Sequence, residues 1–258
     1  MTGTLWIVGI GPGGAEHRTF AAARAVAEAE VVVGYGPYVD MVADLVVGDV
    51  VRGVMGEEER RADEALALAA EGKRVALVSS GDAGVHGMAA RTLARAADLD
   101  VEVVVVPGVT AAQAAAAALG APLTDDFAVV SLSDISTSWE GVEARLSALA
   151  PSGLALCLYN PRSTRRTEQF DRALEILRAA RPATTPVALC HDVTRPGESV
   201  ERTTLAALDP ERVTMRTLVV IAGDTAAETG PWLVALRGTT APGGATDVAT
   251  PPTAEAAR

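Results

Sequence analysis

Aromatic side chains are scarce in this chain of 258 residues: Phe, Tyr and Trp each occur three times and together make up 3% of it. So few rings argue against a surface that stacks on nucleobases or sugars. The chain also lacks long basic runs, and Asp and Glu outnumber Lys and Arg by 33 to 22, which leaves a formal net charge of −11. We therefore expect no nucleic-acid partner, and an acidic ligand only where arginines cluster locally.

Cysteine and histidine are equally sparse. Cys157 and Cys190 lie in apolar runs without a C-x-x-C motif, and His17, His86 and His191 show no spacing typical of metal ligands. We predict two buried thiols and no metal site. No apolar run approaches the roughly 20 residues that span a bilayer, and no basic leader precedes the first apolar strand. The expectation is a cytoplasmic protein with no membrane partner.

The chain is rich in apolar residues, which make up 49% of it, while charged residues make up 21%. This composition excludes wholesale disorder and supports one large or two small domains. Short Val/Ile/Leu runs alternate with stretches of helical length, which is typical of parallel strands buried between helices. For the first half we predict strands near Leu5–Ile10, Val31–Gly34, Arg74–Ser79 and Val101–Val106, and helices near Glu16–Ala29, Glu57–Glu71 and Gly84–Ala97.

A second α/β series follows an Ala-rich helix at Thr110–Leu119 and the helix breaker Gly120–Pro122. Only a short turn, Asp192–Glu198, separates two of its strands, so we predict an antiparallel pair within a mixed sheet. The predicted domains are residues 1–120 and 121–239, and the Ala/Pro/Gly/Thr-rich residues 240–258 are predicted to be a disordered tail. The predicted strands lie near Phe127–Leu132, Leu154–Tyr159, Val187–Cys190, Val200–Thr204 and Thr217–Ala222.

The first strand runs into Gly9-Ile10-Gly11-Pro12-Gly13-Gly14, a match to the G-x-G-x-x-G dinucleotide fingerprint. Two features argue against a nicotinamide enzyme. Pro12 removes a backbone N–H that a pyrophosphate needs, and no carboxylate follows the second strand at Gly34-Tyr35-Gly36. The glycines then form either a tight turn that requires positive φ or a loop that faces a ligand, and the sequence leaves both open.

Three other predicted strand ends carry similar loops. In open α/β sheets, ligands bind beyond the carboxyl ends of the strands. Polar groups at several successive strand ends therefore predict one shared cleft rather than unrelated turns. The three loops are Ser79-Ser80-Gly81-Asp82-Ala83-Gly84, Pro107-Gly108-Val109-Thr110-Ala111 and Tyr159-Asn160-Pro161-Arg162-Ser163.

These loops, in this order and spacing, resemble the tetrapyrrole (corrin/porphyrin) methylase family over about residues 5–238. The resemblance implies two α/β domains, S-adenosylmethionine bound between them as methyl donor, and a homodimer. A competing role for Asp82 is to cap the following helix. By the family's motifs, the cofactor-binding residues are Gly11, Pro12, Gly13, Ser80, Gly81, Asp82, Val85, Thr110, Ala111, Tyr159, Asn160 and Ala188.

Several segments resemble one branch of the family in particular, among them Val33-Gly34-Tyr35, Ser131-Leu132-Ser133-Asp134 and Tyr159-Asn160-Pro161-Arg162-Ser163. That branch methylates precorrin-3B at C(17) and contracts the ring to give precorrin-4, a step of cobalamin biosynthesis. His86 and Asp125 depart from the Tyr and His expected there, which affects the substrate side rather than the cofactor loops. The alternatives are methylation of another carbon or of a cobalt-containing precorrin, and a non-catalytic tetrapyrrole-binding module.

Proton transfers accompany such a ring contraction, so a general acid or base is expected. The candidates are His86, which titrates near neutrality, and Asp134. Each has an ordinary structural alternative: His86 is otherwise a histidine on a helix face, and Asp134 the cap of the helix that contains Trp139.

The substrate that the resemblance implies carries many carboxylates, which an acidic protein must bind through local positive charge. Arg162, Arg165 and Arg166 cluster beside the cleft loop. Arg162 and Arg165 are the predicted substrate contacts, because forked guanidinium groups suit carboxylates. The alternative is the solvated start of a helix.

Overall fold

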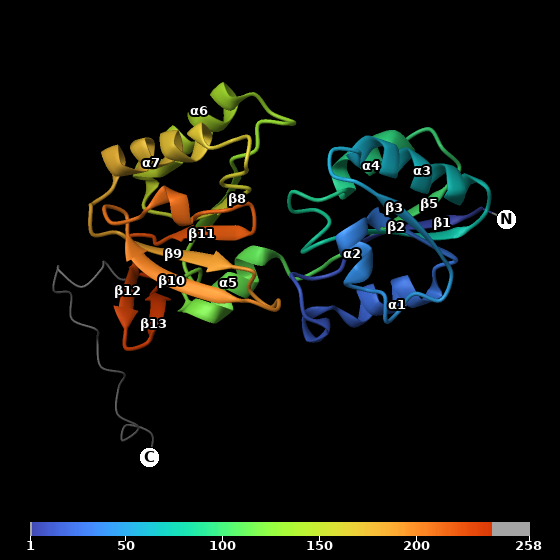
Figure 1. Cartoon of the computed structure of the whole chain (residues 1–258), viewed down its shortest axis with the longest axis horizontal. Coiled ribbons are helices and arrows are strands. Elements are labelled where there is room, and N and C mark those ends of the chain that lie inside the picture. Colours follow the sequence, from blue (N-terminus) through green and yellow to red (C-terminus); the bar gives the residue numbers. More distant parts are fainter. Residues whose placement is uncertain (1, 239–258) are drawn as a thin grey trace, which may run out of the picture.

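The structure, a computed structural model, describes residues 2–238 and shows two lobes joined by one crossing of the chain (Figure 1). The predicted tail, residues 240–258, lies outside the described residues. Each lobe contains one five-stranded sheet with helices packed against it. The predicted fold class, an α/β chain with a parallel sheet followed by a mixed sheet, is confirmed.

The N-terminal sheet is parallel throughout and has the strand order β3-β2-β4-β1-β5. The central strands of this sheet are apolar because both of their faces are buried. In β1, Leu5 and Ile7 face one core cluster and Val8 faces the other, and none of the three is exposed. Strand β5 is an outer strand. The bounds are β1 (Thr4–Gly9), β2 (Val31–Tyr35), β3 (Asp49–Gly53), β4 (Arg74–Ser79) and β5 (Glu102–Val106).

Helices cover both faces of this sheet. α3 (Glu58–Ala70) and α4 (Ala89–Ala96) pack on one face, and α1 (Phe20–Glu28) and α2 (Gly36–Asp40) on the other. The helix predicted from residue 16 is divided into a short 3-10 turn, η1 (Ala15–His17), and α1, because Thr19 caps α1 by accepting a hydrogen bond from the Ala22 N–H.

Three details of the N-terminal lobe differ from the prediction. Strand β3 and helix α2 were not predicted, because each is only five residues long. The helix predicted from residue 84 begins at residue 89 instead, since positive φ angles at Gly81 and His86 keep the preceding segment out of helical geometry.

The C-terminal sheet has the order β10-β9-β11-β8-β7 and mixes parallel and antiparallel pairs. The predicted antiparallel pair is β9 with β10. α6 (Trp139–Leu149) and α7 (Glu168–Ala180) cover one face, and α5 (Ala111–Leu119) packs against the other. The strands are β7 (Phe127–Ser131), β8 (Ala155–Tyr159), β9 (Pro186–His191), β10 (Ser199–Thr204) and β11 (Thr217–Ile221).

A small third sheet, which the sequence did not predict, has the order β12-β13-β6. β6 (Gly120–Ala121) directly follows α5, while β12 (Ala226–Thr229) and β13 (Trp232–Ala235) come from the end of the described chain. α5 shares a core cluster with β9 and β11, so it packs with the C-terminal lobe, although residues 110–119 fall in the first of the two predicted domains. Two 3-10 turns complete the chain, η2 (Ala150–Ser152) and η3 (Pro210–Arg212).

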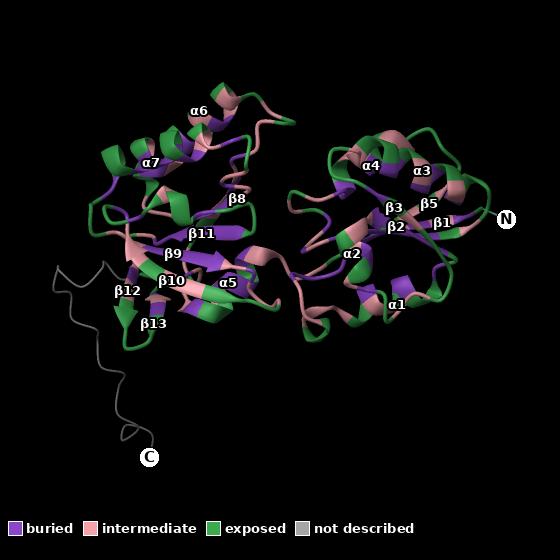
Figure 2. Cartoon of the chain, viewed as in Figure 1, coloured by how far each residue is buried: buried purple, intermediate pink, exposed green. Residues whose placement is uncertain are grey.

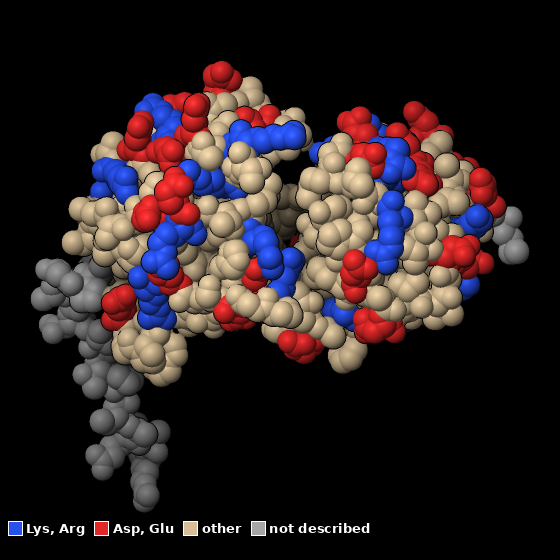
Figure 3. Space-filling model, in the orientation of Figure 1, with Lys and Arg blue, Asp and Glu red and all other residues tan. Residues whose placement is uncertain are grey.

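Burial follows the sheets: the central strands are mostly buried, outer strands such as β3 and β10 are partly exposed, and so are the outward faces of the helices (Figure 2). Cys157 and Cys190 are buried free thiols in the C-terminal sheet, as predicted. No helix within residues 2–238 has the length and apolarity that crossing a membrane requires. Acidic and basic side chains intermingle on the visible face, and a hollow separates the two lobes there (Figure 3).

Candidate active site

Three of the predicted loops meet at the carboxyl edge of the N-terminal sheet, because β4, β1 and β5 are adjacent strands. Gly11 and Gly81 exchange backbone hydrogen bonds of 3.0 and 2.7 Å. Gly108 lies so close that a Cβ there would come within 2.2 Å of the Gly81 carbonyl oxygen and 2.6 Å of the Gly9 carbonyl oxygen. The loops therefore pack backbone against backbone, which a side chain at Gly108 would prevent.

Asp82 links two of these loops. Its Oδ1 accepts a hydrogen bond from the Gly84 N–H, and its Oδ2 accepts one from the Gly108 N–H, each 2.8 Å long. Helix α4 begins only at Ala89, so Asp82 does not cap it. The carboxylate instead fixes the loop after β4 to the loop after β5.

Thr110 and Tyr159 join the N-terminal loops to the C-terminal lobe. Thr110 caps α5 in a capping box with Gln113. The Tyr159 hydroxyl lies 2.6 Å from Thr110 Oγ1 and accepts a hydrogen bond of 2.7 Å from the Ala112 N–H. Burial raises the pKa of Tyr159, so the phenol stays protonated and holds the end of β8 against the start of α5.

His86 lies beside Tyr159, with 5.2 Å between the two ring centroids. It has a φ of 54°, a left-handed conformation uncommon for a non-glycine residue. The ring is exposed, but desolvation by its surroundings lowers the pKa of His86, which favours neutral imidazole near pH 7. The structure thus brings His86 to the predicted cofactor loops, from the opposite lobe to Tyr159.

Asn160 also has positive φ, 50°, and its side-chain N–H donates to Ser131 Oγ at 3.0 Å. Buried Arg166 holds this corner, because its guanidinium donates to the carbonyl oxygens of Leu132 and Asn160 at 2.6 and 2.8 Å. Arg166 is therefore a positioning residue that ties the ends of β7 and β8 together.

Asp134 has partners within the C-terminal lobe. Its Oδ2 accepts a hydrogen bond of 2.8 Å from Gln169, and its Oδ1 lies 3.8 Å from the Arg166 guanidinium. It does not cap α6, since Ser138 does so by accepting from the Gly141 N–H. The assignment of Asp134 as an acid or base stays a prediction.

The two arginines predicted to bind substrate lie in different surroundings. Arg162 pairs with Asp171 at 3.4 Å and with Glu211, and it donates to the Pro210 carbonyl at 3.2 Å. A substrate carboxylate would have to displace these partners. Arg165 is exposed and has no ion pair among the described residues, so it is the better placed of the two.

Ala188 and Val85 differ in how they relate to the loops. Ala188 is fully buried in β9, in the cluster that includes Ala111, Ala112 and Tyr159, so it lies behind the site rather than on its surface. Val85 is half-buried, and its N–H donates to the Asp82 carbonyl oxygen at 3.3 Å. Both cofactor assignments stay predictions.

A residue that the sequence did not single out, Arg195, joins the lobes. Its Nε donates to the Pro12 carbonyl oxygen at 2.5 Å and its Nη2 to Ser80 Oγ at 2.8 Å. A Cβ on Gly13 would lie 2.5 Å from Arg195 Cγ and 2.6 Å from the Thr194 carbonyl oxygen, so this glycine, at an x position of the G-x-G-x-x-G match, is required by contact between the lobes. In the sequence, Arg195 belongs to a short hairpin turn, and nothing local indicates that the turn reaches the first loop.

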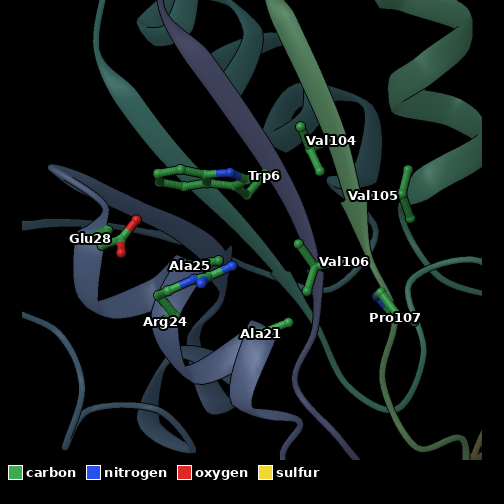
Figure 4. A pocket seen from close by; sticks show the side chains of 9 residues that line it. All are labelled: Trp6, Ala21, Arg24, Ala25, Glu28, Val104, Val105, Val106 and Pro107. Carbon is green, nitrogen blue, oxygen red and sulfur yellow. The ribbon is translucent and has the colours of Figure 1, made fainter.

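The structure has two notable pockets. One, of about 500 Å³, lies along the outer strand β5 and is lined by Trp6, by Arg24 and Glu28 of α1, and by Val104 and Val106 (Figure 4). None of the predicted site residues lines it. The other, of about 380 Å³, lies between the lobes and includes Gly13 and Arg195.

Comparison with known proteins tests whether the chain belongs to the family that its loops resemble or only shares a general α/β fold. The sequence profile of the Tetrapyrrole (Corrin/Porphyrin) Methylases matches residues 4–209. The chain belongs to the tetrapyrrole methylase family. This confirms the resemblance that the loops indicated.

Named relatives and solved structures of tetrapyrrole methylases agree. A probable cobalt-factor III C(17)-methyltransferase of Salmonella typhimurium is 42% identical over 225 residues, 86% of this chain and 93% of its own. A precorrin-3B C(17)-methyltransferase of Sinorhizobium sp is 42% identical over 229 residues, 86% of this chain and 89% of its own. The crystal structure of the methyltransferase CobJ matches with a TM-score of 0.85 and 38% identity, over 91% of this chain and all of that one.

Proposed function

We propose that this protein is an S-adenosylmethionine-dependent methyltransferase of cobalamin biosynthesis that methylates its tetrapyrrole at C(17) with ring contraction. The relatives of 42% identity, both named for C(17), carry this proposal, and the CobJ match over the whole fold supports it. One of these relatives is named for cobalt-factor III and the other for precorrin-3B at the same identity. Both names therefore share methylation at C(17). Precorrin-3B is the substrate we expect, with precorrin-4 as the product.

The residues at the convergent loops suit this cofactor. Gly81 has positive φ, and a Cβ there would meet nothing closer than Thr110 Cα at 3.7 Å, so the loop leaves room for a ligand. The predicted set offers backbone groups, the hydroxyls of Thr110 and Tyr159, and the Asn160 amide. Asp82 adds one negative charge, which suits the ammonium group or the ribose of a cationic sulfonium compound.

Bound at these loops, S-adenosylmethionine supplies an electrophilic methyl group. Its acceptor is an electron-rich ring carbon, so the chain needs no side-chain nucleophile. The two lobes orient the acceptor and exclude water. Neutral His86, at the junction of the lobes, is positioned to take or return the proton that ring contraction requires. Arg165 and Arg162 remain our candidates for binding substrate carboxylates.

We also propose that the protein is a homodimer, as the family resemblance implies, and that it is cytoplasmic, as the sequence predicts. Strand β5 supports a dimer because no other strand within residues 2–238 pairs with its outer edge and its Val104 and Val105 side chains are exposed. Unpaired apolar edges usually pair with another chain or are covered, and a two-fold axis would bring the same edge of a second copy against it.

The decisive experiment is incubation with isotopically labelled S-adenosylmethionine and either cobalt-factor III or precorrin-3B, read by mass. We expect transfer of one methyl group and a ring-contracted product. Calorimetry with S-adenosylhomocysteine on the same sample is the control. Binding of S-adenosylhomocysteine without methylation of either macrocycle would refute the C(17) assignment, and no binding would favour the non-catalytic module.

A further inference from the structure

The pocket of about 380 Å³ between the lobes combines apolar walls with positive charge. Pro37, Tyr38 and Met41, from the segment that starts at α2, form its N-terminal wall. Thr194, Arg195 and Arg216, from the C-terminal lobe, lie opposite. Gly13, one of the predicted cofactor residues, also borders this pocket, but none of the side chains predicted to bind cofactor or substrate lines it.

Arg195 brings an unmatched charge to the pocket. Its hydrogen-bond partners are a carbonyl oxygen and a hydroxyl, and no carboxylate of residues 2–238 lies within ion-pair distance of it. Arg216 differs, because it forms a 2.7 Å hydrogen bond and an ion pair with buried Asp192. The nearby acid Glu198 accepts a hydrogen bond from the Thr194 N–H at 2.7 Å. In a chain with net charge −11, an arginine without an acidic partner beside a pocket is available to an anionic ligand.

Thr194 adds a second, independent feature. Its Oγ1 is buried without a hydrogen-bond partner in the described chain, and its φ of 70° shows that the turn is held in a conformation unfavourable for a β-branched residue. A buried polar atom without a partner costs free energy. Because Thr194 lines the pocket, rotation of its side chain would let the hydroxyl donate to an oxygen of a ligand there.

We propose that this pocket binds a carboxylate arm of the macrocyclic substrate, with Arg195 supplying the charge and Thr194 a hydrogen bond. Pro37, Tyr38 and Met41 contact the methylene part of the arm. The inference rests on the proposed function. It assigns the arm to the substrate rather than to the carboxylate of the cofactor, because the predicted cofactor loops converge on Gly81 and Thr110 instead.

Met41 offers a matched pair of variants, since its side chain lines the pocket and packs on the edge of one N-terminal core cluster, and both variants lose that packing to the same extent. Met41→Glu places a negative charge in the pocket, and Met41→Gln a neutral group of the same shape. We expect Met41→Glu to raise both the KM and the equilibrium Kd for precorrin-3B about tenfold, and Met41→Gln to stay within about twofold of the parent. The Kd for S-adenosylhomocysteine should change less than twofold in both.

Arg195→Lys and Arg195→Gln test the charge itself. The lysine variant should retain most of the affinity for precorrin-3B, whereas the glutamine variant should lose about tenfold or more. An equal loss of S-adenosylhomocysteine affinity in both variants would show that Arg195 only positions the Pro12 and Ser80 loops, and would overturn the proposal. Equal Kd values for Met41→Glu and Met41→Gln would overturn it as well.

Binding of precorrin-3B and of cobalt-factor III by the parent protein separates this inference from the proposed function. If the parent neither binds nor methylates either macrocycle, the proposed function fails and the pocket assignment fails with it. If the parent binds and methylates it while all four variants behave like the parent, the function stands and only the pocket assignment is wrong.

Discussion

His86 combines exposure to the junction of the lobes, a strained backbone and a lowered pKa. A base must be neutral to accept a proton, so activity that depends on His86 is lost only when the pH falls through this lowered pKa, below the ordinary value near 6.5. We predict that His86→Phe slows single-turnover product formation about a hundredfold and removes the acidic limb of the pH profile. Single-turnover rates from pH 5 to 9 measure this, and a variant with the parent's rate and profile would exclude His86.

Asp82 allows a second prediction at this scale. Asp82→Asn keeps the shape of the side chain but replaces one accepting oxygen with an NH₂ group, so either the Gly84 or the Gly108 N–H loses its partner. We expect the Kd for S-adenosylhomocysteine to rise about tenfold, since a hydrogen bond to a charged group contributes about 1.5–3 kcal/mol. Calorimetry measures it, with Asp98→Asn, on the exposed end of the first lobe, as control. An unchanged Kd would show that the carboxylate has no part in the cofactor site.

Burial makes the two cysteines unreactive. Desolvation raises the pKa of both Cys157 and Cys190 to about 12, so almost no thiolate forms at pH 8, and the thiolate is the reactive species. We predict no reaction of the folded protein with a thiol reagent at pH 8, and two reacting thiols after denaturation, measured by mass. Rapid labelling of the folded protein would contradict the burial of these strands.

At the scale of elements, the glycine loop after β1 contacts both lobes, because it belongs to the N-terminal lobe and packs against the turn between β9 and β10. A Cβ on Gly13 would lie 2.5 Å from Arg195 Cγ and 2.6 Å from the Thr194 carbonyl oxygen. Gly13→Ala therefore forces the hairpin turn of β9 and β10 away from the loop.

We expect Gly13→Ala to destabilise the protein by about 1–3 kcal/mol, as for other overpacked contacts, and to weaken S-adenosylhomocysteine binding. Gly36→Ala is the matched control, because a Cβ at Gly36 would meet nothing nearer than 4.0 Å. Chemical denaturation and calorimetry measure the two effects. If both variants lose the same stability, the contact with Arg195 does not constrain the loop.

The secondary structure that could be predicted from sequence is the part determined locally. Apolar runs such as the one in β4 identify buried strands without further information. β6 could not be predicted, because its two residues become a strand only by pairing with β13, more than a hundred residues away. The same holds for Arg195, whose role comes from contacts with Pro12 and Ser80 in the other lobe.

Within the site, the sequence located the loops but not the contacts within them. Adjacent strands of a parallel sheet bring their carboxyl ends together, so the meeting of Gly11, Gly81 and Gly108 follows from strand order. Strand order is itself a long-range property. The partners of Arg162 could not be predicted either, since Glu211 is far from it in the chain.

At the scale of the whole molecule, the proposed dimer depends on the outer edge of β5. Val105→Lys places a charge on that edge, and edge lysines are known to prevent pairing between strands. We predict a monomer in analytical ultracentrifugation with a melting temperature close to that of the parent. Val47→Lys is the control, because Val47 is exposed but lies outside every strand. A dimer that survives Val105→Lys would place the interface elsewhere.

Because β6 pairs with β13, the last strand of the described chain supports the segment that follows α5, although the two strands lie more than a hundred residues apart. β6 is the segment where the polypeptide leaves α5 for the second sheet, and β13 runs parallel to it. The last strand thus holds the segment after α5 within the C-terminal lobe, and its Leu233 and Ala235 share a core cluster with α5. Truncation before Trp232 would leave both large sheets intact but remove this support from α5, whose N-terminus presents Thr110 to the site, so the shortened protein would lose the fixed position of that residue on which in-line transfer depends.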